Sequence, residues 1–463
     1  MYIKQLTLNN FRSFADLTIP FVDEDRDDRP SRTVVFIGNN GAGKTAILDA
    51  LKINLSWLVA RINRDKGNGF HIADTDIRNE QAFAAIALQV QYEERFYNWQ
   101  VAKTLKGRLK SAESQLDEAS KLALLFKEQL SLNANNAALP LIAYYPVERV
   151  VLDIPLKIKT RHSFGQLDGY DNALQGVNFR RFFEWFRERE DIENESLSGH
   201  LPPFSTNAML INIIEKFGLS KDDDIGAAFN TAIDENLKVW AKLKDRQLTA
   251  ARIAIKTFIS DLDNLRIQRK PRLQMLVDKN GKTLDVAQLS QGEKSLMALV
   301  GDIARRLAIM NPALENPLQG KGIVLIDEID LHLHPNWQRV VVGNLNKTFP
   351  NCQFVLTTHS PIVISESPNL LCYSLDNGNL QKLNNLYGMD VNQVLLQDME
   401  ASIRNADIQQ DFDNLRDNLQ EGRLADAKQL LAELEQKIAI DNLELSKARL
   451  LIRRLETQYA ANH

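Results

Sequence analysis

Residues 38–45 have the types and the spacing needed to hold phosphate groups. They read GNNGAGKT, fit the pattern GxxxxGK followed by Ser or Thr, and lie between the apolar stretch TVVFI and a segment with helical apolar spacing. Glycines let successive backbone N–H groups wrap a phosphate, and the following helix adds the partial positive charge of its N-terminus. We expect Lys44 at the β- and γ-phosphates of a nucleotide and the Thr45 hydroxyl on Mg²⁺. The other nucleotide contacts are expected from Asn39, Asn40, Gly41, Ala42 and Gly43.

Two adjacent carboxylates follow a second apolar stretch. Residues 322–326 read GIVLI, and Asp327 and Glu328 come directly after them. Neighbouring carboxylates at the end of a buried strand are costly unless a cation neutralises them, which favours Mg²⁺ here. Asp327 is expected to hold the metal through water, and Glu328 to orient or deprotonate the water that attacks the nucleotide. An apolar strand followed by Asp-Glu is weak evidence for a magnesium site when it occurs alone. It becomes strong evidence when the same chain also has a phosphate loop.

Two further motifs have ordinary structural explanations as well as functional ones. Residues 289–295, LSQGEKS, open a segment with helical apolar spacing, and Ser290 fits a helix N-cap beside a solvated Glu–Lys pair. His359 follows the strand-like stretch QFVLT within TTHSP, and a lone histidine at a strand end is more often structural. His332 and His334 alternate along one turn without a third ligand, so no metal site is predicted there.

The order of these four motifs resembles that of ABC- and SMC-type ATPases. LSQGEKS is similar to their signature motif in the variant of SMC-like and RecF-like members, and phosphate loop, signature, DE strand and lone histidine follow in that family's order. The resemblance implies an α/β fold, an ABC-type P-loop ATPase head that uses ATP and Mg²⁺. It implies that Ser290 and Gly292 contact the ATP held by a second copy, so that the chain works as a head-to-tail dimer or higher oligomer. The expected catalytic residues are Lys44, Glu328 and His359, the last sensing the γ-phosphate.

Arg12 is a further candidate nucleotide contact. It lies in NFRSF, residues 10–14, which resembles an element of RecF-like ATPases in which the arginine lies near the nucleotide. The resemblance implies a phosphate or base contact for Arg12. An ordinary surface salt bridge explains the residue equally well.

Composition favours a protein of several packed units without a membrane segment. The chain has 463 residues, 44% of them hydrophobic, and a formal charge of -4, so no overall basic excess indicates nucleic acid. The first residues alternate like a strand, and no run of about 18 apolar residues occurs. Cys352 and Cys372 lie in apolar stretches without metal-binding spacing. We expect a cytoplasmic location, with neither disulfide nor zinc.

The pattern along the chain predicts an ATPase head with inserted helices and a helical end. Leucines between 104 and 132 predict one helix, and NG at 280–281 predicts a hairpin turn. The C-terminal pattern resembles two helices joined at Glu421-Gly422. The expected parts are a first ATPase lobe (1–102), a short helical insertion (103–135), a return to the head (136–173), a helical insertion (174–270), a second lobe with signature, carboxylates and histidine (271–390) and a C-terminal helical interaction hairpin (391–463).

The finer pattern resembles the compact ATPases of Septu-type and retron-associated antiphage systems. It comprises LIAYYPVERV, YDNALQG, FRRFFEWFRERED, DEIDLHLHPNWQ and the helical tail. The resemblance implies a slow regulatory ATPase that controls a separately encoded HNH-type nuclease, docked on the C-terminal helices. No long coiled coil and no strand-borne DxD cluster after residue 368 is seen, so no nuclease centre is expected in this chain.

Two alternatives remain open on the residues. One is the ATPase of another two-component system with a Toprim-type effector. The other is a RecF-like repair ATPase that clamps duplex DNA, and DNA or a retron nucleic acid is then a partner. Solvated helix faces are the more ordinary explanation of the basic clusters. These clusters are Lys103, Lys106, Arg108 and Lys110, and Arg266, Arg269, Lys270 and Arg272.

Overall fold

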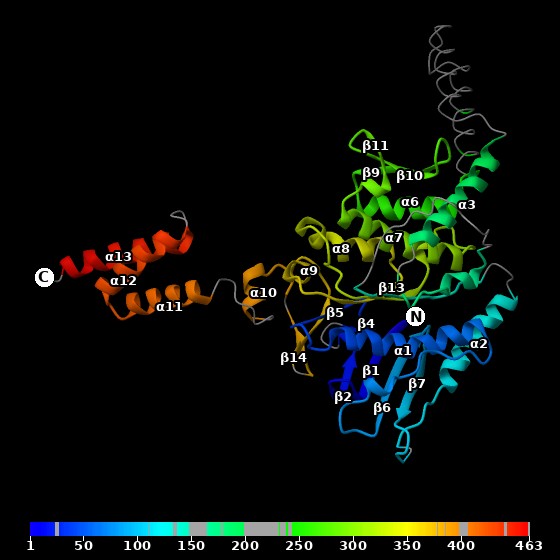
Figure 1. The fold of residues 1–463 in the computed structure, drawn as a ribbon, viewed down its shortest axis with the longest axis horizontal. Helices are drawn as coiled ribbons and strands as arrows, with labels where there is room; N and C mark the ends of the chain where they lie inside the picture. The colour runs from blue at the N-terminus through cyan, green and yellow to red at the C-terminus, as the bar shows by residue number, and fades with distance from the viewer. Residues whose placement is uncertain are drawn as a thin grey trace, which may run out of the picture. The chain divides into compact units, whose positions relative to one another are not determined.

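The computed structural model describes most of the chain as two compact units. The units are residues 1–389 and 390–463 (Figure 1). The described residues are 1–23, 27–109, 111–132, 137–147, 164–176, 179–198, 231, 238, 243–376, 378–384, 386–397, 406–438 and 442–461.

The centre of the first unit is a six-stranded sheet with the strand order β15-β14-β5-β13-β12-β8. All neighbours pair in parallel except β14 and β15, which are antiparallel. Every residue of β8, β12 and β13 is buried, as expected for apolar strands covered on both faces. The strands are β5 (Thr33–Gly38), β8 (Leu141–Tyr145), β12 (Gly322–Ile326), β13 (Cys352–Thr357), β14 (Leu371–Asp376) and β15 (Asn379–Leu383).

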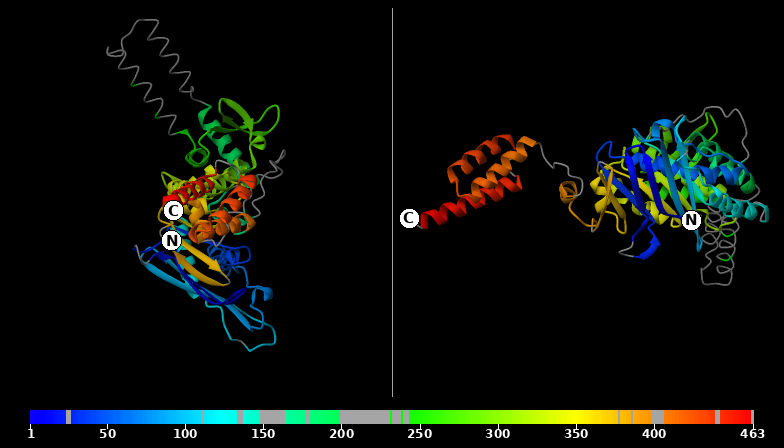
Figure 2. Two further views of the ribbon diagram at one scale, coloured as in Figure 1. Left: turned by 90° about the vertical axis from the view of Figure 1, so that its left-hand side faces the viewer. Right: turned by 90° about the horizontal axis from the view of Figure 1, so that it is seen from below.

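A second, antiparallel sheet has the order β2-β1-β6-β7. Helix α1 (Lys44–Asn63) contacts strands of both sheets, and the blue and cyan strands of this sheet run side by side in Figure 2. The two sheets therefore enclose α1, which explains why its apolar residues are buried nearly all round. The strands are β1 (Tyr2–Phe11), β2 (Phe14–Pro20), β6 (Phe83–Tyr92) and β7 (Arg95–Thr104).

The single helix predicted over 104–132 is wrong in its first half, because α2 spans only Asp117–Leu132. Gly107 has φ 80, a turn conformation that ends any helix there. Beyond it the backbone bonds to the edge of β7: Gln115 and Gln100 exchange N–H···O bonds of 2.8 Å. The leucine spacing is therefore overridden by pairing at the sheet edge.

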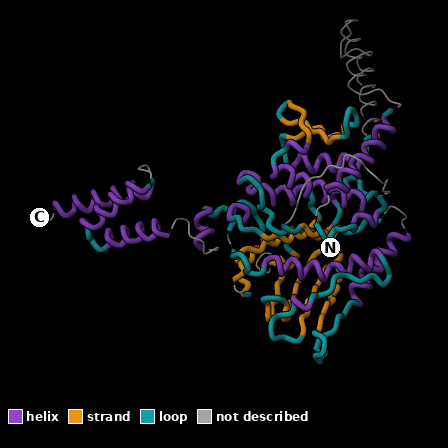
Figure 3. The backbone as a smooth tube through the Cα atoms, viewed as in Figure 1, coloured by secondary structure: helices purple, strands orange, loops and turns teal. Residues whose placement is uncertain are grey.

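Helices cover the opposite face of the central sheet (Figure 3). Helix α7 (Gln291–Met310) contacts β8 and packs against α6 (Arg246–Phe258) and α3 (Phe179–Leu197), and α6 also contacts α8 (Pro335–Thr348). The short elements are β3 (Val22–Asp23), β4 (Asp27–Pro30), α9 (Pro361–Ser365) and 3₁₀ turns at Asp74–Asp76, Gln166–Tyr170, Val286–Gln288 and Pro317–Gln319.

A small three-stranded sheet, β11-β10-β9, joins these helices. It consists of β9 (Leu262–Gln268), β10 (Gln274–Lys279) and β11 (Lys282–Asp285), and the predicted turn at 280–281 is confirmed by positive φ at Asn280 (50) and Gly281 (75). The helical pattern predicted to residue 270 is wrong at its end, because 262–268 forms β9 and alternates in burial. Most of the preceding insertion, 199–242, lies outside the described residues.

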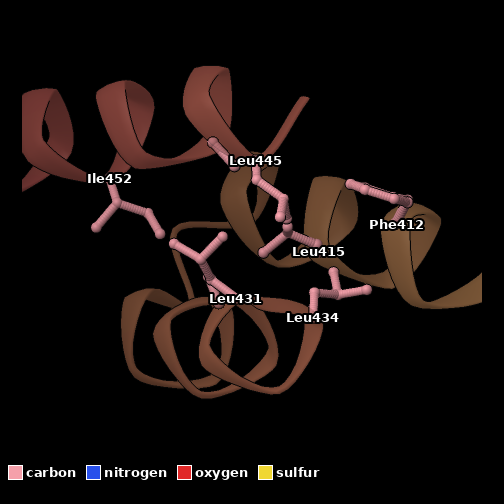
Figure 4. Packing of buried hydrophobic residues seen from close by; sticks show 8 residues of the cluster. Phe412, Leu415, Leu431, Leu434, Leu445 and Ile452 are labelled. Atoms are coloured by element: carbon pink, nitrogen blue, oxygen red, sulfur yellow. The ribbon is translucent and has the colours of Figure 1, made fainter. Parts of the chain in front are cut away.

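The second unit contains α10 (Val391–Gln397), α11 (Ala406–Gln420), α12 (Leu424–Lys437) and α13 (Leu443–Ala461). The joint predicted at Glu421-Gly422 separates α11 from α12, and Gly422 has φ 75. The third long helix, α13, packs on the predicted hairpin. The shared core consists of Phe412, Leu415, Ala427, Leu431, Leu434, Leu445, Ala448 and Ile452 (Figure 4).

Cys352 and Cys372 are buried free thiols. Within the described ranges, no group of three or more His, Cys, Asp and Glu side chains could hold a metal ion. Among the described helices, none is both long enough and apolar enough to cross a bilayer.

Candidate active site

The phosphate loop follows β5, at the carboxyl edge of the parallel strands, and leads into α1. Gly38, Gly41 and Gly43 have φ of 142, 83 and 106, conformations that side chains rarely adopt. A Cβ on Gly43 would lie 2.6 Å from Cζ of Phe14, and one on Gly38 would lie 2.3 Å from the carbonyl oxygen of Leu375. Gly38 and Gly43 are therefore required by close packing around the loop as well as by its backbone, and Gly41 by its backbone conformation alone.

Lys44 is the first residue of α1 and folds back over the loop. Its Nζ donates to the carbonyl oxygens of Gly38 (2.7 Å) and Asn39 (3.1 Å), and the residue is only 7% exposed. Burial lowers the pKa of Lys44, while the charges of Glu328, Asp327 and Asp330 oppose that change. The ammonium group thus lies above the loop backbone, where phosphate oxygens can replace the carbonyls as acceptors.

The two predicted magnesium ligands contact each other. The Thr45 hydroxyl donates to Oδ2 of Asp327 at 2.9 Å, although the residues lie 282 positions apart. Asp327 is 1% exposed and is fixed by its own N–H, which donates to the carbonyl of Tyr145 at 2.9 Å. A hydroxyl and a carboxylate are oxygen ligands of the kind that Mg²⁺ prefers, so this pair fits the metal.

Glu328 lies one residue beyond the metal carboxylate in an unusual backbone conformation. Its φ is 45, which for a residue with a side chain indicates a conformation imposed by its surroundings. Its N–H donates to Oγ1 of Thr357 at 2.7 Å, and the same hydroxyl donates to Oδ1 of Asp327. Thr357 therefore fixes the carboxylate of Asp327 and the backbone of Glu328. The sequence pattern around His359 contains Thr357 but predicts no role for it.

Asp330 ties the loop that carries His359 to the loop that follows the carboxylates. Its Oδ1 accepts from the Thr358 hydroxyl at 2.6 Å and from the N–H of His359 at 3.4 Å. The Ser360 hydroxyl adds a bond of 2.8 Å to Oε1 of Gln338 at the start of α8. Because β12 and β13 are adjacent, these bonds place half-buried His359 close to Glu328 in the fold.

The signature residues lie at the N-terminus of α7 in a different cavity. Ser290 caps the helix, since its Oγ accepts from the N–H of Glu293 at 3.3 Å. A Cβ on Gly292 would lie 2.6 Å from the carbonyl oxygen of His332 and 2.9 Å from the Trp337 ring. The cavity, about 730 Å³, is lined by Ser290, Gly292 and Lys279 among others and by no residue of the phosphate loop. The structure therefore does not bring the signature and the loop together within one chain.

Arg12 is engaged by two carboxylates beside α1. Its Nε donates to Asp76 at 2.8 Å and its Nη1 to Asp49 at 2.9 Å. It lines a cavity of about 440 Å³ together with Lys52, Tyr144 and Gln175. The ion-pair alternative is thus what the structure shows, and a nucleotide contact by Arg12 stays a prediction.

The parallel sheet, the phosphate loop before α1 and the contact of Thr45 with Asp327 define a P-loop ATPase head of the ABC/SMC-like class. A family model described as "AAA domain, putative AbiEii toxin, Type IV TA system" matches residues 127–365, and one described as "AAA domain" matches residues 5–198. The solved "SMC head domain from Thermotoga maritima" matches 83% of this chain and 98% of its own, with a TM-score of 0.39 and 16% identity.

Similar sequences indicate which group of ATPases within this class the chain resembles. The chain is 37% identical to "Retron Vc95 probable ATPase" of Vibrio cholerae over 78% of this chain and 71% of that protein. It is 34% identical to "Retron Ec83 probable ATPase" of Escherichia coli over 83% and 71%. It is 45% identical to "Septu protein PtuA" of Bacillus mycoides over 16% of this chain and 10% of that protein. The chain belongs to the family of retron-associated ATPases.

Proposed function

We propose that this chain is the regulatory ATPase of an antiphage defence complex and that two copies close head to tail around Mg-ATP. The proposal rests on the separation of two half-sites. The first consists of the phosphate loop with Asp327 and Glu328, and the second of the signature residues Ser290 and Gly292. The Thr45–Asp327 contact lies at one place and the Ser290 cavity at another, with no phosphate-loop residue in that cavity. A second copy supplies the missing half.

Each residue of the first half-site has a task that its position supports. Lys44 holds the β- and γ-phosphates, and Thr45 and Asp327 hold Mg²⁺, which neutralises charge on the phosphates. Glu328 orients the attacking water, and its backbone is fixed by Thr357. His359, held beside Asp330, contacts the γ-phosphate and senses its loss. Turnover is slow, because hydrolysis waits for assembly from two chains.

The trap variant Glu328→Gln tests this proposal. With ATP and Mg²⁺ it is expected to accumulate as a dimer in native mass spectrometry and to hydrolyse ATP far more slowly than the wild type. Glu328→Gln combined with Lys44→Ala is the matched control and should stay monomeric. Hydrolysis at the wild-type rate would remove Glu328 from its role, and a monomer under all conditions would refute the head-to-tail assembly.

The second unit is proposed to dock the separate HNH-type nuclease. A groove of about 560 Å³ runs between α11 and α13, with Phe412, Leu419, Leu451 and Leu455 in its wall. An amphipathic helix of the nuclease fits such a groove, because its apolar face replaces water along the leucines.

A matched pair of substitutions tests this docking surface. Leu451, which lines the groove, and its neighbour Leu450, which does not, are both exposed, at 48% and 65%. Leu451→Arg is expected to abolish co-purification of the nuclease encoded beside this chain, whereas Leu450→Arg retains it. Equal capture by both variants would place the nuclease elsewhere.

The structure gives less support to the DNA-clamp alternative. Two of its basic candidates pair with carboxylates, Lys103 with Asp74 at 3.2 Å and Arg266 with Asp278 at 3.0 Å. Arg269 pairs with Glu190 at 3.1 Å, and Lys110 lies outside the described residues. Cations already paired with carboxylates gain less from phosphate contacts, because those pairs must first break.

A further inference from the structure

A buried carboxylate lies directly beneath the signature serine. Glu293 is 3% exposed, whereas Ser290, one turn earlier, is exposed. One carboxylate oxygen of Glu293 accepts both the N–H (2.9 Å) and the hydroxyl proton (2.8 Å) of Ser290. In this arrangement the Ser290 hydroxyl donates its only proton to Glu293 and has none left for another acceptor.

Lys279 reaches the same carboxylate from another element. It is the last residue of β10, before the turn to β11, and its Nζ donates to the other oxygen of Glu293. Asp261 lies 3.6 Å from the same Nζ and is exposed. Lys279 thus connects the small sheet to the N-terminus of α7.

Both members of this pair are charged at neutral pH. The hydrogen bond to Glu293 raises the pKa of Lys279. Burial raises the pKa of Glu293, but the hydrogen bonds from Lys279 and Ser290 outweigh it and leave that pKa below its ordinary value. A full negative charge therefore lies behind Ser290, in the cavity where the proposed dimer places the partner's γ-phosphate.

We propose that Lys279 is a positioning residue of the composite ATP site, where it neutralises Glu293 so that Ser290 can turn its hydroxyl to the partner's γ-phosphate. The inference rests on the proposed function, since it concerns ATP held by a second copy. Without Lys279 the incoming phosphate meets an uncompensated carboxylate that also competes for the serine proton. Like charges brought together in a desolvated interface oppose association strongly.

Charge compensation and simple structural support predict different results in double substitutions. Lys279→Met should raise the ATP concentration for half-maximal dimerisation by about tenfold or more, because the carboxylate is then unpaired. Lys279→Arg should keep the parent value. Lys279→Met with Glu293→Gln should recover dimerisation to about the level of Glu293→Gln alone, because no charge remains to compensate. A merely structural lysine would not be rescued by removing its partner's charge.

The experiment uses the full chain with Glu328→Gln as parent. Dimer formation is followed by native mass spectrometry across ATP concentrations, and binding to the monomer by a fluorescent ATP analogue at low protein concentration. Monomer binding should be unchanged in every variant, because Lys279 lies outside the phosphate-loop half-site. Lys282→Met, an exposed lysine on the same hairpin, is the matched control and should behave as the parent.

The possible failures are distinguishable. If Lys279→Met dimerises like the parent, or if the double variant is as weak as Lys279→Met alone, the inference about Lys279 is overturned while the proposed function stands. If the Glu328→Gln parent itself forms no ATP-dependent dimer, the proposed function fails and the inference falls with it.

Discussion

An ionic cluster inside α7 allows a quantitative prediction about stability. Asp302 is fully buried and accepts from Arg305 Nη2 at 2.8 Å, Arg306 Nε at 2.7 Å and the Tyr145 hydroxyl at 3.0 Å. Both arginines are 1% exposed. One carboxylate therefore balances two buried guanidinium groups. Asp302→Asn leaves both uncompensated and is expected to cost about 3–5 kcal/mol of unfolding free energy.

Arg305→Met is the matched variant, because it removes one positive charge from the cluster whereas Asp302→Asn removes the negative one. Arg306 also donates to the carbonyls of Gly169 (2.7 Å) and Asp171 (2.9 Å), whereas among the described residues Arg305 donates to Asp302 alone. Burial lowers the pKa of Arg305, and the neighbouring charge of Arg306 lowers it further. Replacing it by an apolar side chain of similar length leaves a neutral pair, so the unfolding free energy should stay within about 1 kcal/mol of the wild type.

Urea unfolding followed by tryptophan fluorescence provides the assay. All five tryptophans lie before residue 390, so the signal reports on the first unit alone. The midpoint should fall strongly for Asp302→Asn and barely move for Arg305→Met, with an unchanged slope in both. If the two substitutions destabilise equally, packing rather than charge balance determines the stability of this cluster, and the reasoning is refuted.

Two further predictions concern the nucleotide and a buried thiol. Lys44→Ala should abolish binding of a fluorescent ATP analogue while leaving the unfolding free energy within about 1 kcal/mol of the wild type, because among the described residues the ammonium bonds only to loop carbonyls and adds little to stability. Burial raises the pKa of Cys352 from 9.0 to about 12, so its thiol should resist an aromatic disulfide reagent at pH 8 until the unit unfolds. Because the pKa of Cys352 is higher in the folded chain than in the unfolded chain, the buried neutral thiol stabilises the fold fully below about pH 9. This stabilisation should be lost as the pH rises from about 9 towards 12, and the urea midpoint should fall over the same range.

The residues proposed for the half-site could be predicted from the sequence because each lies shortly after an apolar strand. Parallel strands bring such ends to one edge of a sheet, which is why Thr45 meets Asp327 across 282 residues. Asp330 and Thr357 were not assigned, since their importance comes from bonds between the loops after β12 and β13. No local pattern marks which hydroxyl or carboxylate will join two loops.

The errors in the predicted fold have a common physical origin. The segment before α2 carries leucines at helical spacing, yet its Gln115 bridges to Gln100 of β7. Residues 262–268, predicted as helical, pair with β10. Backbone groups at a sheet edge require partners, and this requirement outweighs weak local helix propensity. The turn at Asn280-Gly281 was predictable, because those two residue types tolerate positive φ.

Tyr145 links the two half-sites that one chain contributes to different ATP molecules in the proposed dimer. Its carbonyl accepts from the N–H of Asp327, the metal carboxylate, and its hydroxyl donates to Asp302 in the signature helix α7. Both bonds lie in the packed interior, where displacements of one element are passed to the next. In the proposed dimer, the partner's nucleotide at Ser290 and the metal at Asp327 would be connected through α7 and β8. Under that proposal each chain presents halves of two sites on one connected frame, and we expect closure at one site to favour closure at the other.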